Sequence, residues 1–120
     1  MLRHERVRAW ALCHDLTLAV YRSTESWPKS ELYGLTSQIR RAAVSAAANL
    51  AEGAAKLGSR EFRRYADTSL GSLAEISYLL RLAKDLGHLS SAEHESLEDL
   101  RKNAGGMTWK LACALSKSSN

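Results

Sequence analysis

Apolar side chains recur at intervals of three and four residues along most of this chain, which is the spacing of one face of an α-helix. The pattern is divided by Pro28, Gly58 and Gly87. Proline can begin a helix but not continue one, and a glycine just past a helix commonly adopts the left-handed conformation that ends it. The pattern predicts four helices, over residues 6–24, 30–57, 59–86 and 91–116.

The starts of the later helices carry capping residues. Ser30 and Ser59 are suitable N-caps, and Ser90 with Glu93 has the spacing of a capping box. The connections are short, and no stretch alternates between apolar and polar residues as a strand would. We therefore predict an all-α fold, an antiparallel up-down-up-down four-helix bundle that forms a single domain over residues 1–120.

The second predicted helix is rich in alanine between Gln38 and Gly53, so a neighbouring backbone can come close to it. Gly71, in the middle of the third helix, is expected to mark that close approach, because glycine costs about 1 kcal/mol against alanine in a helix. The pair Gly105–Gly106 is expected to loosen or bend the fourth helix.

A polar stripe interrupts the alanine-rich helix and is expected to face polar residues of the third helix. One interpretation is a hydrogen-bond network that fixes the register of the two helices, and the other is a ligand or metal pocket. The residues concerned are Ser45, Asn49, Glu52, Ser72 and Glu75. The chain lacks the two Glu-x-x-His pairs of a di-iron bundle, and no nucleophile or phosphate-cradling glycine loop accompanies the carboxylates. We expect no metal, no cofactor, no small-molecule substrate and no enzymatic activity.

The first predicted helix carries two apolar rows. One row includes Trp10, Leu18 and Tyr21, and the second runs beside it. Either this helix is buried on two sides within one chain, or the second row forms a subunit interface. The candidate interface residues are Leu12, Leu16, Ala19 and Val20.

The charge balance is basic, with 17 Lys and Arg against 13 Asp and Glu, a net charge of +4. Basic residues gather at the N-terminus (Arg3, Arg6 and Arg8) and at the start of the third helix. Either they form an ordinary solvated surface, or they contact phosphates without reading bases. Glu61 and Asp67 lie among them and weaken the second interpretation. The candidate phosphate contacts are Arg40, Arg41, Lys56, Arg60, Arg63 and Arg64.

The location of the protein is predicted from three features. No apolar run approaches the ~20 residues of a membrane span, and the first ten residues are charged where a signal peptide is hydrophobic. Cys13 and Cys113 are far apart in sequence and are expected to be reduced. We expect a cytoplasmic protein with no membrane partner.

The motifs of the second and third predicted helices carry a resemblance. The run from Tyr21 and Trp27-Pro28 through Glu31, Gly34-Leu35, Gln38, Arg40-Arg41-Ala42, Ser45, Asn49 and Ala51-Glu52-Gly53, followed by Gly71-Ser72 and Glu75, resembles the signature of the four-helix-bundle proteins encoded in intervening sequences of bacterial 23S rRNA genes. Phenylalanine is common in that family where Trp27 stands, and Ile or Val with a proline is common where Ala46 and Ala47 stand.

The resemblance implies a bacterial, cytoplasmic bundle that assembles as a ring-shaped homopentamer. The family is also similar in fold to the basic accessory proteins of diversity-generating retroelements, which form pentameric barrels and associate with a reverse transcriptase and nucleic acid. We therefore expect a non-enzymatic homo-oligomer that presents a basic surface to RNA or a ribonucleoprotein. The alternative is a structural or protein-interaction module with no nucleic-acid partner.

Overall fold

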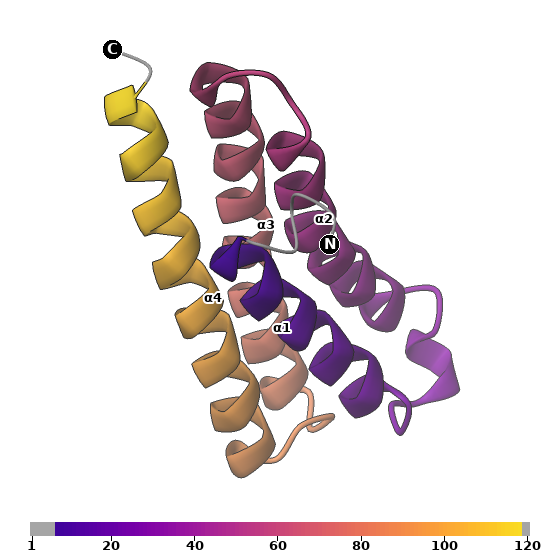
Figure 1. Ribbon diagram of the computed structural model, residues 1–120. Coiled ribbons are helices and arrows are strands. Elements are labelled where there is room, and N and C mark those ends of the chain that lie inside the picture. Colours follow the sequence, from indigo (N-terminus) through magenta and orange to yellow (C-terminus); the bar gives the residue numbers. More distant parts are fainter. Residues whose placement is uncertain (1–6, 119–120) are drawn as a thin grey trace.

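The computed structural model describes residues 7–118, which form an antiparallel up-down-up-down four-helix bundle and contain no β-strand. The predicted fold class is confirmed. Each α-helix packs against two neighbours, in the cyclic order α1, α2, α3, α4 (Figure 1). The elements are α1 (Arg8–Thr24), the 3₁₀ helix η2 (Lys29–Glu31), α2 (Leu35–Ala54), α3 (Ser59–Asp85) and α4 (Ser91–Ser118).

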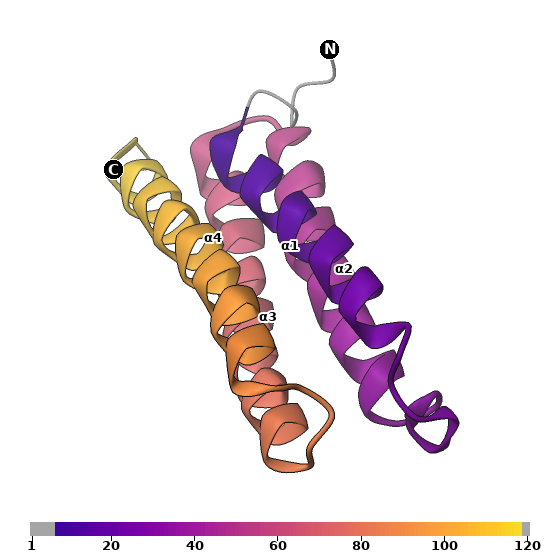
Figure 2. The ribbon, with the colours of Figure 1, turned by 90° about the horizontal axis from the view of Figure 1, so that it is seen from below.

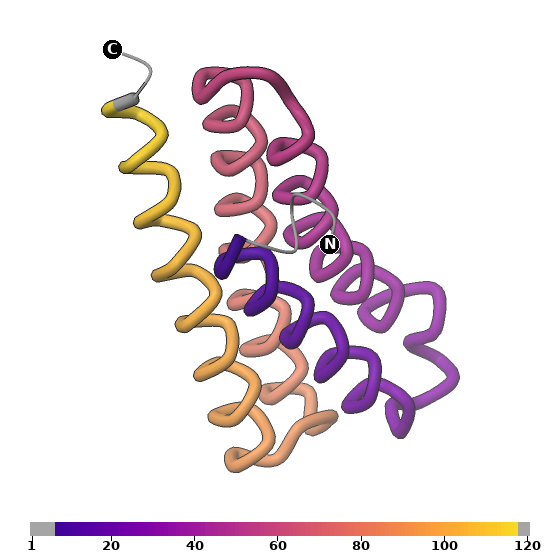
Figure 3. The backbone as a smooth tube through the Cα atoms, in the orientation of Figure 1, coloured from indigo at the N-terminus to yellow at the C-terminus, as the bar shows by residue number. Residues whose placement is uncertain are grey.

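The four helices differ in length, and this shapes the bundle. Helix α1 has 17 residues and α4 has 28, so α1 covers only part of the length of its neighbours (Figure 1). Seen from below, α1 lies along α2, and α4 lies along α3 (Figure 2). The chain reverses direction tightly between α2 and α3 and takes a longer path, through η2, between α1 and α2 (Figure 3).

The second helix is shorter at both ends than the sequence predicts. It begins at Leu35 rather than residue 30, because Lys29–Glu31 closes a 3₁₀ turn, and Ser30 therefore caps no α-helix. It ends at Ala54, and Leu57, the last residue of the predicted helix, is 91% exposed. Residues 55–57 are therefore outside the helix and belong to the turn between α2 and α3. This turn ends at Gly58, which has a φ of +95° and directly precedes α3.

The ends of the third and fourth helices follow the sequence more closely. Gly87 has a φ of +84°, and the N–H of His88 donates to the carbonyl of Ala83 at 2.9 Å, which closes α3 as predicted. The capping box is also confirmed. The N–H of Ser90 donates to Glu93 Oε1 at 2.9 Å, and the N–H of Glu93 donates to Ser90 Oγ at 3.1 Å.

The core contains residues of all four helices. Two of the residues predicted for a subunit interface belong to this core. Leu16 and Val20 of α1 are 0% and 1% exposed, because they face the inside of their own bundle. They are therefore unable to form a contact between subunits. Leu12 and Ala19 are half-buried against the same core. The row expected to face inwards is instead the more exposed one, with Leu18 at 39% and Tyr21 at 41%.

Two predictions about glycine are wrong. A Cβ at Gly71 would meet nothing within 4 Å, so no backbone approaches there. The close approach lies at Gly53, where a Cβ would stand 2.7 Å from Tyr65 Cβ and 2.8 Å from Phe62 Cδ1. Helix α4 continues unbroken through Gly105–Gly106. Packing against both α1 and α3 outweighs the weak helix propensity of the two glycines.

A polar cluster closes the end of the bundle where η2 meets the turn after α3. His88 Nε2 lies 2.9 Å from Glu31 Oε2, and the N–H of Leu35 donates to Glu31 Oε1 at 3.4 Å. The hydrogen bond from His88 is the main cause that lowers the pKa of Glu31 below its ordinary value of 4.5. Trp27 packs on the same histidine, with ring centroids 5.7 Å apart.

This cluster predicts a dependence of stability on pH. A carboxyl with a lowered pKa stabilises the folded state above its ordinary value of 4.5, and this contribution is lost as the pH falls through the lower pKa of the folded protein. The substitution Glu31→Gln should therefore lower the urea midpoint at neutral pH and have little effect near about pH 3. Glu25→Gln, at an exposed residue nearby, is the control. If the difference in urea midpoint between wild type and Glu31→Gln stays constant with pH, the attribution of this pH dependence to Glu31 is contradicted.

Candidate nucleic-acid interface

The predicted polar network between α2 and α3 exists, with fewer members than the sequence suggests. Ser45 Oγ and Ser72 Oγ share a hydrogen bond of 2.8 Å across the two helices. Asn49 Nδ2 donates to the carbonyl and the hydroxyl of Ser45, at 2.8 and 3.1 Å. These bonds join the helices at one register and fix the orientation of the Asn49 amide, so that its Oδ1 remains available as an acceptor.

The two carboxylates of the predicted network lie outside it. Glu75 Oε2 accepts a hydrogen bond from Gln38 Nε2 at 3.3 Å on the exposed side of the helix pair. Glu52 is exposed and makes no contact with Ser45 or Ser72. Helical spacing alone placed Glu52 on this stripe, but the stripe turns towards solvent before it reaches the end of α2.

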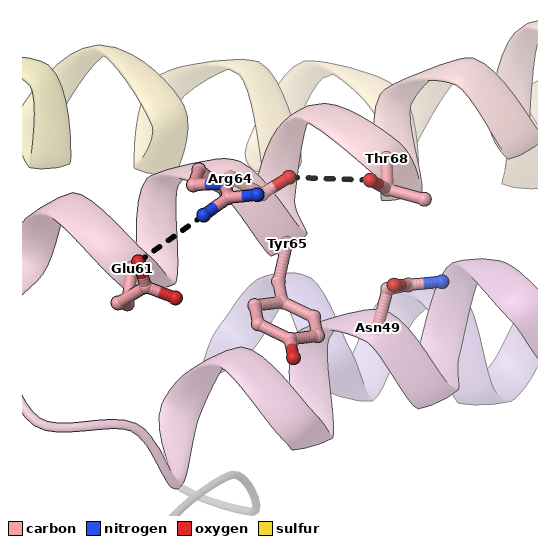
Figure 4. A pocket seen from close by; sticks show the side chains of 5 residues that line it. All are labelled: Asn49, Glu61, Arg64, Tyr65 and Thr68. Atoms are coloured by element: carbon pink, nitrogen blue, oxygen red, sulfur yellow. Dashed lines mark hydrogen bonds and ion pairs between the residues drawn. The ribbon is translucent and has the colours of Figure 1, made fainter.

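A pocket of about 360 Å³ opens beside Asn49, between the last turns of α2 and the first turns of α3. Tyr65 projects from α3 towards α2, with Asn49 on one side and Glu61 on the other (Figure 4). Arg64 Nη1 lies 3.4 Å from Glu61 Oε1, and Thr68 donates to the carbonyl of Arg64 at 3.2 Å (Figure 4). The pocket thus combines an aromatic ring, a guanidinium group and several hydrogen-bond acceptors.

Four basic residues lie at this end of the bundle, of which Arg64 lines the pocket and Lys56 lies near its tyrosine. The Lys56 ammonium lies 5.5 Å from the centre of the Tyr65 ring, and both Lys56 and Arg60 are exposed, with no acidic partner among the described residues. Arg63 pairs with Asp67 at 3.0 Å and Arg64 with Glu61, as stated above. Both pairs are solvent-exposed and therefore contribute little stability, so a phosphate can compete for either arginine. We call Lys56, Arg60, Arg63 and Arg64 the basic end.

The other two candidate phosphate contacts lie elsewhere. Arg40 is held against α1, where its Nε donates to Thr24 Oγ1 at 2.8 Å and its guanidinium lies 4.7 Å from the centre of the Tyr21 ring. Arg41 is exposed but lies about 20 Å along α2 from the end of that helix at Ala54, from the helical rise of 1.5 Å per residue. The structure therefore joins four of the six predicted residues into one surface and separates Arg40 and Arg41 from it.

No group of three or more His, Cys, Asp or Glu side chains within residues 7–118 is placed to hold a metal ion. Burial raises the pKa of the Cys13 thiol to about 11, which keeps it protonated and unreactive at neutral pH. None of the helices in this part of the chain combines the length and apolar character that a membrane span requires.

Two surfaces escaped the sequence reasoning. An open groove of about 740 Å³ runs between α1 and the start of α2, beside the exposed side chains of Tyr21, Leu32 and Val44. A second groove, of about 430 Å³, lies between α1 and α4 and carries Arg8, Lys102 and Lys110. Helical periodicity gave no signal for either groove, because each depends on which side chains of distant segments come together.

These features define the protein as an antiparallel helical bundle with a basic, aromatic-containing surface at one end. Family comparison then specifies the class further. The model of the 23S rRNA-intervening sequence protein family matches residues 5–110, so the chain belongs to that family. No curated protein matches this sequence significantly.

Proposed function

We propose that this chain is a non-enzymatic, self-associating bundle protein that binds RNA, free or within a ribonucleoprotein, through its phosphates. The observation that carries the proposal is the basic end. There, Lys56 and Arg60 are exposed and have no acidic partner among the described residues, and the Lys56 ammonium lies 5.5 Å from the centre of the Tyr65 ring. A solvated surface that serves only solubility needs no exposed lysine against an aromatic ring at a pocket.

The chemistry of the basic end suits single-stranded RNA. Lysine and arginine contact backbone phosphates in any sequence, and an aromatic ring can stack on any base. Tyr65 supplies the ring, and the fixed Asn49 amide presents an acceptor beside it. Binding of this kind depends strongly on salt and weakly on sequence.

The surface beside the groove between α1 and α2 supports the proposed self-association. Leu32 and Val44 are 46% and 45% exposed, and Tyr33 is 94% exposed, so a large apolar and aromatic surface faces solvent in a single chain. Such a surface is typical of a protein interface. A second copy of the chain is the partner we propose, in a homo-oligomer for which the resemblance suggests five subunits. Assembly would also sum the excess positive charge over the copies.

Binding of fluorescent RNA of about 12 nucleotides, measured by anisotropy at about 50 and 200 mM salt, tests the proposal. We expect Lys56→Ala/Arg60→Ala to weaken binding about tenfold at the lower salt and to reduce the slope of log K against log salt by about 1.4, since two phosphate contacts are removed. Arg22→Ala/Lys29→Ala removes the same charge from exposed residues at the opposite end of the bundle and should change the affinity less.

Two results would contradict the proposal. Absence of saturable RNA binding at low salt would favour the alternative, a protein-interaction module with no nucleic-acid partner. If the two double variants lose the same amount of RNA affinity, net charge rather than the basic end determines binding. Light scattering on the same sample measures the mass of the particle, and a monomer would exclude self-association through the surface beside the α1–α2 groove.

A further inference from the structure

The groove between α1 and α4 lies away from the basic end and has a different chemistry. Arg8 and Leu12 of α1 form one wall, and Asn103, Gly106 and Lys110 follow one another along a single face of α4. Met107 and Leu12 supply an apolar floor, and both are half-buried against the core. The two helices are antiparallel, so the start of α1 faces the later turns of α4 (Figures 1 and 2).

The charged residues that line this groove are all positive. Arg8, Lys102 and Lys110 are exposed, line the same groove, and have no acidic partner among the described residues. No carboxylate is among the lining residues, whereas Glu61 lines the pocket at the basic end. Two acids lie close to this set along the helices without lining the groove: Asp15 is one turn after Leu12 on α1, and Asp99 is one turn before Lys102 on α4. Three cations that line one groove repel one another, and this repulsion is relieved when an anion binds between them.

The groove also has room for a ligand because Gly106 contributes no side chain. A Cβ at Gly106 would meet nothing within 4 Å, so packing within the chain gives no reason for glycine at this position. Glycine nevertheless weakens the interior of a helix by about 1 kcal/mol against alanine. The open space above Gly106 is part of the groove, between Lys102 and Lys110, where an oxyanion could reach both ammonium groups and the Asn103 amide.

We propose that this groove is a phosphate-binding site, in which Lys102, Lys110 and Arg8 contact the phosphate oxygens and Asn103 donates a hydrogen bond. A phosphate of an RNA backbone and a terminal or free phosphate share this chemistry. The site does not rest on RNA binding at the basic end, because its residues come from other helices or other parts of the bundle. Lysine and arginine donate charge-assisted hydrogen bonds to phosphate, and these are stronger than neutral ones.

Calorimetric titration of the purified protein with inorganic pyrophosphate, and anisotropy titration with RNA carrying either a 5′-hydroxyl or a 5′-phosphate, test this site. We expect Lys102→Ala/Lys110→Ala to weaken pyrophosphate binding at least fivefold. The control Lys29→Ala/Lys84→Ala removes two lysines from the other end of the bundle and should leave it within twofold. Gly106→Glu places a carboxylate in the open groove, where its Cβ has no clash, and should also weaken binding while the helix remains folded.

The two RNAs distinguish the source of the phosphate. If the groove variants lose affinity for both RNAs, backbone phosphates occupy the groove. If they lose affinity for pyrophosphate and the 5′-phosphorylated RNA alone, the groove binds a terminal or free phosphate. Either result supports the site. Pyrophosphate binding that is absent in wild type, or that is equal in the groove variants and the control while all remain helical by circular dichroism, overturns it. Neither result depends on whether Lys56 and Arg60 bind RNA.

Discussion

Replacement of Gly53 by alanine is expected to destabilise the bundle by about 2 kcal/mol, although alanine is normally the better helix former. The added Cβ would stand 2.7 Å from Tyr65 Cβ and 2.8 Å from Phe62 Cδ1. Tyr65 Cβ is fixed to the backbone of α3, so the contact can be relieved only if α2 and α3 move apart. The free energy of unfolding, measured by urea denaturation, checks this prediction.

Gly71→Ala is the control for this substitution. Gly71 also lies inside a long helix, but a Cβ there would meet nothing within 4 Å, so alanine should stabilise the protein by about 1 kcal/mol. The same chemical change is thus expected to have opposite signs at two glycines of neighbouring helices. If the two variants shift the urea midpoint in the same direction, the close approach of α2 and α3 at Gly53 is not as tight as described.

These two glycines also show where sequence reasoning about this fold stops. Periodicity and capping residues predicted the number, order and most ends of the helices, because those signals are local to each helix. The choice between Gly53 and Gly71 as the point of close approach depends on how two helices are rotated against each other. Periodicity identifies two apolar rows on α1 but does not determine which row faces inwards, and for this reason it left open whether Leu16 and Val20 belong to the core, where they lie, or to a subunit interface.

For the candidate sites too, the sequence predicts features within one helix but not those that depend on how helices pack. Residues close together on one helix or one turn can be grouped from the sequence, as with Lys56, Arg60, Arg63 and Arg64 at the basic end. The sequence alone did not separate Arg40 from this group, because its contact with Tyr21 joins segments from two helices. The groove between α1 and α4 was missed for the same reason, since Arg8 lies about a hundred positions from Lys110 in the chain.

The location of the basic surfaces relates the two proposals. The basic end lies at the turn between α2 and α3. The proposed phosphate groove lies between α1 and α4, the helix pair that shares no member with α2 and α3. The exposed apolar surface lies beside a third boundary, between α1 and α2. Assembly through that third boundary would leave both basic surfaces accessible to a polyanion, so the copies could bind one RNA at several points.

Trp27→Ala is expected to destabilise the protein by about 3 kcal/mol, because it removes a large aromatic side chain from the closed end of the bundle. Trp27 is 7% exposed, belongs to the core and packs on His88, which in turn bonds to Glu31. Loss of the indole would leave a cavity and release the histidine. The urea midpoint measures the loss, and Trp109→Ala, at a tryptophan that is 62% exposed, should change it by about 0.5 kcal/mol or less.

The same residue should tolerate phenylalanine. Trp27 Nε1 is buried and has no hydrogen-bond partner among the described residues, and an unsatisfied buried donor destabilises a fold by about 1–3 kcal/mol. Phenylalanine keeps most of the apolar contact and removes the donor, so the two effects should offset to within about 1 kcal/mol. This expectation fits the family signature, in which phenylalanine is common at this position. If Trp27→Phe proves as damaging as Trp27→Ala, the indole N–H must be satisfied in the folded protein, and the end of the bundle must depend on that hydrogen bond rather than on ring packing.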